Sequence, residues 1–92
     1  MSVARIEVIA GESGHVVRLF GRWTLASTSR VAADLSQELD RVADASSIWD
    51  CMDLEAIDSA GAMLIWHVWN RTAPSQLLIK PEHWRVFERI DT

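Results

Sequence analysis

The sequence predicts a single α/β domain built on a mixed four-stranded sheet, with its elements in the order β-β-α-β-α-β-α. Two observations support this fold class. Two runs of β-forming residues are joined by one short turn, and two further short apolar runs alternate with stretches of helical periodicity. The 92 residues accommodate one domain with a modest core, and hydrophobic residues at 49% argue against disorder.

The first two strands are predicted at residues 5–9 and 15–20. The first alternates between polar and apolar side chains, and the second is rich in β-forming residues. The turn at residues 11–14 is short, which favours an antiparallel hairpin. Gly21 is expected to break the second strand.

The first helix is predicted over residues 28–43, because its apolar residues recur at helical spacings of three and four. That apolar stripe consists of Val31, Leu35, Leu39 and Val42. The candidate N-caps are the hydroxyl residues Ser27, Thr28 and Ser29. The opposite face, which should be solvated, carries Arg30, Asp34, Gln37, Glu38 and Arg41.

The third strand and the second helix follow. Residues 48–54 are mostly apolar and bounded by turn signals, so they predict a strand in which Asp50 must face outward or find a partner. A loop then leads to Ser59, and a helix is predicted over residues 60–71.

A short buried strand at residues 76–79 and a helix at residues 82–90 complete the predicted fold. Pro81 suits the first turn of that helix. Strands two, three and four are separated by helices, so they should run parallel. Right-handed crossovers in one direction place both linking helices on the same face of the sheet.

Charge and cysteine content exclude several classes of protein. Thirteen acids oppose nine bases, which gives a net charge of −4, and the single lysine, Lys80, belongs to no basic cluster. A nucleic-acid surface needs clustered positive charge, so none is expected. Cys51 lies in an apolar strand and is expected to be a small buried residue.

No membrane span is expected either. The longest uncharged stretch, between Asp58 and Arg71, has twelve residues, whereas a membrane helix needs about 20. Arg5 and Glu7 precede any long apolar run, so the N-terminus does not resemble a signal peptide. The segment is therefore expected to be soluble and cytoplasmic.

The sequence offers no recognisable catalytic or metal-binding motif. His15, His67 and His83 lie far apart and lack the spacing of metal ligands. Asp53 and Asp58 are the one pair that suggests acid–base chemistry, but a strand end and a loop usually hold solvated or capping carboxylates. We therefore expect a non-catalytic protein without a metal or another cofactor.

The turn Asp58-Ser59-Ala60-Gly61 is expected to open the second helix. A helix start exposes about four unpaired N–H groups and carries partial positive charge, so Asp58 or Ser59 is suited to cap it. Gly61 allows another backbone segment to approach closely. Two interpretations stay open: an ordinary cap, or a hydroxyl at which an added phosphate is favoured by the helix and repelled by Asp58.

The second helix carries an unusually wide apolar arc. Its apolar side chains are Ala62, Met63, Leu64, Ile65, Trp66, Val68 and Trp69. Such a helix is either buried nearly all round or in contact with another protein, and full burial is hard to achieve in 92 residues. We therefore expect Trp66 or Trp69 to be exposed, or to be buried against a second copy in a dimer of the isolated domain.

Four partner-binding residues are predicted on this basis. Met63, Trp66 and Trp69 should line a protein-binding surface on the helix. Trp23, in the expected loop after Gly21, either plugs the core or joins that surface.

These features together resemble the STAS family, named for sulfate transporters and anti-sigma-factor antagonists. The family's Asp-Leu-Ser strand and Asp-Ser/Thr-Ser/Ala-Gly turn appear here as Asp53-Leu54-Glu55 and Asp58-Ser59-Ala60-Gly61. The resemblance covers nearly the whole chain, and it implies one STAS-like domain over residues 1–92. It also implies that Asp53, Asp58, Ser59 and Gly61 are motif residues. Ser59 occupies the position that a partner kinase phosphorylates in the antagonists, which switches their binding off.

Two branches of the family are considered. The Asp-Ser-Ala-Gly turn is similar to that of STAS domains in Mla-type lipid-transport ABC systems, and residues 21–26 resemble their Gly-Asp-Trp-Thr-Leu stretch, with Arg22 replacing the acid. This implies a domain that docks on the ATPase subunit, as the cytoplasmic N-terminal piece of a longer permease at the bacterial inner membrane. The alternative is a stand-alone anti-sigma-factor antagonist switched by phosphorylation of Ser59.

Overall fold

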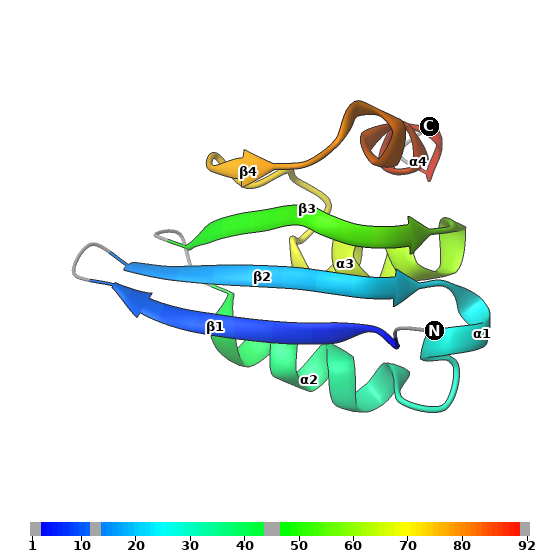
Figure 1. The fold of residues 1–92 in the computed structure, drawn as a ribbon, viewed down its shortest axis with the longest axis horizontal. Coiled ribbons are helices and arrows are strands. Elements are labelled where there is room, and N and C mark those ends of the chain that lie inside the picture. Colours follow the sequence, from blue (N-terminus) through cyan, green and yellow to red (C-terminus); the bar gives the residue numbers. More distant parts are fainter. Residues whose placement is uncertain (1–2, 12–13, 44–46, 91–92) are drawn as a thin grey trace.

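The computed structural model describes residues 3–11, 14–43 and 47–90. Its strands form one sheet in the order β1-β2-β3-β4 (Figure 1). The strands are β1 (Arg5–Gly11), β2 (Gly14–Trp23), β3 (Ile48–Ile57) and β4 (Leu77–Leu78). The helices are α1 (Leu25–Thr28), α2 (Ala32–Val42), α3 (Ser59–Val68) and α4 (Pro81–Ile90). The predicted mixed four-stranded sheet is confirmed, and α1 is an additional single turn.

Strand directions also agree with the prediction. β1 and β2 are antiparallel in an unbroken register, from Arg5 opposite Phe20 to Gly11 opposite Gly14. β2 pairs with β3 in parallel, and β3 pairs with β4 in parallel. Glu12 and Ser13, at the centre of the predicted turn, lie outside the described residues.

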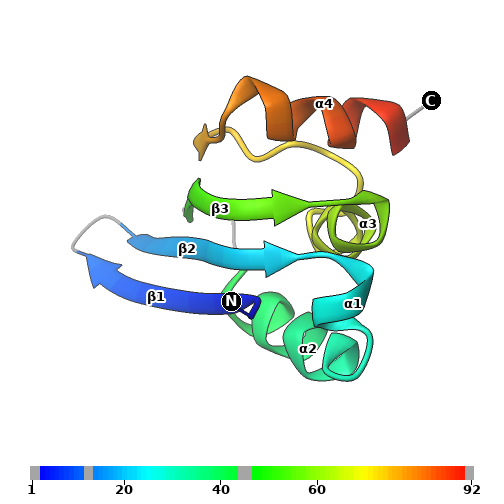
Figure 2. The ribbon, with the colours of Figure 1, turned by 45° about the vertical axis from the view of Figure 1, so that its right-hand side comes forward.

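The sheet has one covered face and one open face. Figures 1 and 2 show α2 and α3 behind the sheet, as right-handed crossovers predict. Among the described residues, no helix covers the other face (Figure 1). Alternate residues of β2 and β3 point into the core beneath the helices, and these are Val17, Leu19, Trp49 and Cys51.

The expectation that Gly21 ends the second strand is wrong, because β2 continues through it to Trp23. Gly21 has φ +87°, a conformation that favours glycine. A Cβ at this position would lie 1.9 Å from the carbonyl oxygen of Val3. The pairing with β3 shifts register between Gly21 and Arg22, so the glycine bends the strand instead of breaking it.

The helix predicted over residues 28–43 is observed as α2, which begins only at Ala32, and the predicted first residue, Thr28, is the last residue of α1. Thr28 is buried and its hydroxyl donates to the carbonyl oxygen of Thr24 at 2.8 Å, so it belongs to α1. The N-cap of α2 is Val31, which has no side-chain capping bond, and the predicted hydroxyl cap is therefore wrong. α2 ends at Val42 with Ala43 as its C-cap, close to the predicted end.

The boundaries around α3 also differ from the prediction. β3 extends to Ile57, so almost no loop precedes Ser59. α3 ends at Val68 and not at residue 71, because Asn70 and Arg71 adopt left-handed conformations with φ of 56° and 63°. Within the described part of the chain, none of the helices has the length and apolar character required to cross a membrane.

Candidate functional site

Asp58 joins the first turns of two helices. It is the N-cap of α3, where Oδ1 accepts a hydrogen bond from the backbone N–H of Gly61 at 3.0 Å. Its Oδ2 accepts a second bond from the backbone N–H of Leu25, in α1, at 2.9 Å. One carboxylate therefore fixes α1 against the start of α3, and Asp58, not Ser59, is the cap.

The surroundings of Asp58 keep it ionised. Partial burial by itself raises the pKa of the Asp58 carboxyl, but the backbone N–H groups of Leu25, Gly61 and Ala60 act in the opposite direction. Together these donors outweigh the burial, and the pKa of Asp58 lies below its ordinary value. A second negative group next to it would meet a fixed negative charge.

Gly61 is required by the close approach of α3 to the end of β2. A Cβ on Gly61 would lie 1.8 Å from the carbonyl oxygen of Trp23. The same oxygen accepts a bond from the backbone N–H of Asp58 at 3.2 Å. The expectation that Gly61 lets another backbone segment approach is confirmed.

Ser59 is exposed at the first position of α3, where the sequence placed it. Met63 follows one helical turn later and is 60% exposed. Leu25, held by Asp58, is 61% exposed and belongs to α1, which lies beside the start of α3 in both views (Figures 1 and 2). We call Leu25, Ser59 and Met63 the α3 entry surface. The sequence interpretation missed Leu25, although its position directly after Thr24 in the family-like stretch was a signal.

Trp66 of α3 and Trp69, which directly follows the helix, do not belong to this surface. Trp66 and Trp69 are only 9% and 7% exposed, so the expectation that one of them is open to solvent or needs a second copy is wrong. Trp69 packs edge-on against Trp49 of β3, with ring centroids 5.5 Å apart, and stacks on Phe87 of α4 at 5.2 Å. α4 therefore covers the side of α3 that the sheet leaves open.

Trp23 is likewise a core residue. Its side chain has no exposed surface, and its indole N–H donates to the carbonyl oxygen of Phe20 at 3.1 Å. The alternative that it joins a docking surface is wrong, because β2 continues to Trp23 and turns its side chain into the core. Of the four predicted partner-binding side chains, Met63 is the one that a partner can reach.

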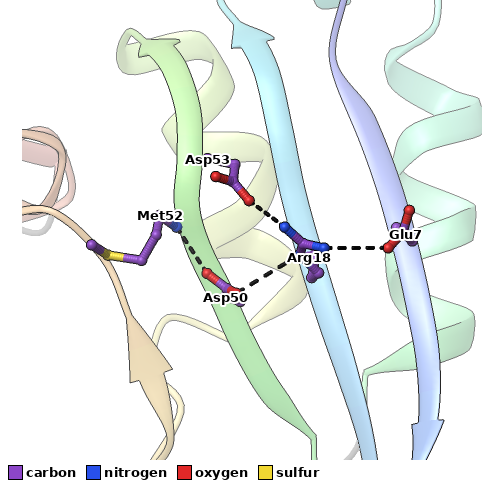
Figure 3. A network of polar contacts seen from close by, with 5 residues as sticks. All are labelled: Glu7, Arg18, Asp50, Met52 and Asp53. Atoms are coloured by element: carbon purple, nitrogen blue, oxygen red, sulfur yellow. Dashed lines mark hydrogen bonds and ion pairs between the residues drawn. The ribbon is translucent and has the colours of Figure 1, made fainter.

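Asp53 lies within β3, whereas Asp58 lies at the start of α3. Asp53 is in the middle of β3, half-exposed on the open face, and it pairs with Arg18 of β2. Figure 3 shows the Arg18 side chain surrounded by those of Asp53, Asp50 and Glu7. Its Nε lies 3.8 Å from Oδ2 of Asp50, and its Nη1 lies 3.5 Å from Oε1 of Glu7. Asp50 thus faces outward and has a partner, as predicted, whereas the expectation of a strand end for Asp53 is wrong.

This geometry separates the two aspartates that suggested acid–base chemistry. β3 runs on from Asp53 to Ile57, about 13 Å of extended chain, before Asp58 is reached. Asp53 is paired with Arg18, and Asp58 is held by backbone N–H groups. The carboxylates do not face a common site. The Arg18 network was missed, although an arginine on one predicted strand and carboxylates on both neighbouring strands were a signal.

Neither Cys51 nor the potential metal ligands form a further candidate site among the described residues. Cys51 is buried as predicted, and its burial, with the nearby Asp50, raises the pKa of the thiol to about 12. Within residues 3–11, 14–43 and 47–90, no three His, Cys, Asp or Glu side chains are grouped to hold a metal ion.

Comparison with known proteins identifies the fold. No protein-family model and no curated protein sequence matches the chain. A solved structure, described as the anti-sigma factor antagonist SpoIIAA in its unphosphorylated form, is similar, with a TM-score of 0.53 at 21% identity. The alignment covers 96% of this chain and 80% of that one. At this identity the likeness establishes the fold, and the predicted STAS-like fold is confirmed.

Proposed function

We propose that this chain is a non-catalytic, STAS-type regulatory domain that binds a protein partner through the α3 entry surface. The observation that carries the proposal is the exposure of Ser59, together with that of Met63 one turn later in α3 and of Leu25, whose backbone N–H is bonded to the neighbouring Asp58. Apolar side chains of this size gain free energy when a partner covers them. A phosphate or carboxylate at Ser59 would add charge beside Asp58 and weaken such an apolar contact.

The partner we propose is the ATPase subunit of an ABC transporter. The support comes from the family-like stretch at residues 21–26 and from Ala60 in the turn. Leu25 belongs to that stretch, and its backbone N–H is bonded to Asp58, the residue before Ser59, which supports a surface shared by both sequence features. In this proposal residues 1–92 are the cytoplasmic N-terminal domain of a lipid-transport permease in the bacterial inner membrane.

A stand-alone anti-sigma-factor antagonist is the second candidate. It is favoured by the fold shared with SpoIIAA and by the exposed hydroxyl of Ser59 at the start of α3. Here a kinase-type anti-sigma factor is the partner, and phosphorylation of Ser59 ends the binding.

The test is a binding titration of the wild type, Ser59→Ala and Ser59→Glu against the ATPase subunit and against a kinase-type anti-sigma factor from the same genome. Ser59→Glu should stay folded, because negative charge at a helix start is tolerated. It should bind at least about tenfold more weakly, whereas Ser59→Ala should bind within about twofold of the wild type. Binding to the ATPase subunit supports the first candidate function, and binding to the anti-sigma factor supports the second. Equal binding of folded Ser59→Glu and wild type would place the docking surface elsewhere.

A further inference from the structure

The short helix α1 depends on contacts with other elements for its position. It has four residues, too few for a helix that is stable by itself. Thr28, at its end, is its one buried residue, whereas Leu25, at its start, is exposed. The N-cap residue Thr24 makes no side-chain capping bond. The start of α1 therefore needs an anchor from elsewhere in the chain.

Asp58 supplies this anchor, because its single carboxylate caps two helices. Oδ1 accepts a hydrogen bond from the N–H of Gly61 at 3.0 Å, and Oδ2 accepts one from the N–H of Leu25 at 2.9 Å. Both donors belong to first turns, where backbone N–H groups have no partner within their own helix. The bond from the Thr28 hydroxyl to Thr24 joins α1 only to its own cap residue. The Oδ2 bond therefore fixes the start of α1 against the start of α3.

We propose that Asp58 is a positioning residue for partner binding: through the backbone N–H of Leu25, it holds the leucine side chain in the α3 entry surface. This inference rests on the proposed function of that surface. An apolar side chain that is already held in place loses less conformational freedom when a partner covers it, so it contributes more to affinity. The carboxylate oxygens of Asp58 are engaged by N–H groups of the protein, and its effect on binding passes through Leu25.

The variant Asp58→Ser separates helix capping from the positioning of Leu25. Serine is about as good an N-cap as aspartate, so its hydroxyl should keep the bond to Gly61. It offers one oxygen in place of two, and this oxygen lies closer to the backbone, so the bond to Leu25 should be lost.

Hydrogen exchange followed by NMR measures this separation without a partner. In Asp58→Ser the N–H of Leu25 should exchange at least about tenfold faster than in the wild type, and that of Gly61 should change less than about threefold. Asp40→Ser makes the same substitution at an exposed position of α2 and serves as the matched control. It should leave both exchange rates within about twofold of the wild type.

A double-mutant cycle then tests whether Asp58 acts through Leu25. The wild type, Asp58→Ser, Leu25→Ala and the double variant are titrated with the ATPase subunit, or with the kinase-type anti-sigma factor if that is the protein that binds. Each single variant should bind at least about fivefold more weakly than the wild type. The double variant should bind within about twofold of the weaker single variant, because a leucine that is no longer held has little left to contribute. Asp40→Ser should bind like the wild type.

Three outcomes overturn the proposal. The first is unchanged exchange of the Leu25 N–H in Asp58→Ser, and the second is wild-type affinity of Asp58→Ser or Leu25→Ala for the partner. The third is a double variant whose loss of affinity equals the product of the two single losses. Met63→Lys distinguishes these failures from a failure of the proposed function. If Met63→Lys binds more weakly than the wild type, the α3 entry surface stands without this role of Asp58, and if it binds equally well, the surface itself is wrong.

Discussion

The two ends of α3 have similar apolar content but opposite surroundings. At the start of the helix Ser59 and Met63 face solvent, and only Gly61 and Ala62 are buried. Toward its end Ile65 and Trp66 are buried, as is Trp69 directly after the helix. The difference arises because α4 packs its aromatic residues on the second half of α3. A wide apolar arc therefore identifies a docking surface only where no later element of the chain covers it.

The largest expected effect separates the two ends directly. Trp69→Ala removes a buried indole that contacts both Trp49 and Phe87, so it should lower the free energy of unfolding by about 3–5 kcal/mol. Met63→Ala truncates an exposed side chain and should change it by less than about 0.5 kcal/mol. Urea unfolding of both variants measures the difference. Similar losses for the two would contradict the assignment of core and surface.

The next effect tests the close approach at the start of α3. Gly61→Ala places a methyl group against the carbonyl oxygen of Trp23, and the backbone at this contact has little freedom to move. The free energy of unfolding should fall by about 3 kcal/mol. Ala60→Ser, which changes the neighbouring residue of the same turn by one hydroxyl, serves as the control and should cost well under half of that. A Gly61→Ala protein as stable as the wild type would mean that α3 is not seated on β2 as described.

The smallest expected stability effect concerns Asp58. Asp58→Ala removes the cap of α3 and the acceptor for Leu25, so it should cost about 1–2 kcal/mol at neutral pH. Ser59→Ala, at the next position, removes no capping bond and should cost less than about 0.5 kcal/mol. Equal losses for the two variants would contradict the identification of Asp58 as the cap.

Asp58 should also affect how the free energy of unfolding depends on pH. Because its pKa is lower in the folded state, its contribution is fully present above the unfolded-state pKa of about 4. The stabilisation that Asp58 contributes is lost as the pH falls through its pKa in the folded state. Urea unfolding between about pH 5 and pH 2 should therefore show a smaller loss of stability for Asp58→Ala than for the wild type.

The sheet, the strand directions and the positions of most helices were predictable, because they depend on local periodicity and on the order of elements. The break at residues 29–31 was not, because Thr28 bonds back to Thr24 and enters the core instead of capping a helix. The burial of Trp66 was not predictable from α3 alone. It depends on Trp84 and Phe87, which come from a different helix.

The candidate site was predictable in part. The order of Asp58, Ser59 and Gly61 at a helix start predicted the cap and the close approach correctly, since a carboxylate before a helix caps it and a glycine there leaves room for another backbone segment. Leu25 was missed because a hydrogen bond between distant segments brings it there. Asp53 was placed in the same motif, yet an irregularity in the pairing of β3 with β2, between Arg18 and Phe20, leaves it on the open face with Arg18.

The central claim is that a partner docks on the α3 entry surface, and a matched pair of methionine variants tests it most directly. Met63→Lys and Met52→Lys make the same change at exposed positions, at 60% and 44%, but Met52 lies on β3 and not beside Ser59. Titration of the partner by calorimetry should give binding at least about tenfold weaker for Met63→Lys and unchanged within about twofold for Met52→Lys. Equal affinities of the two folded variants for the partner would contradict the claim.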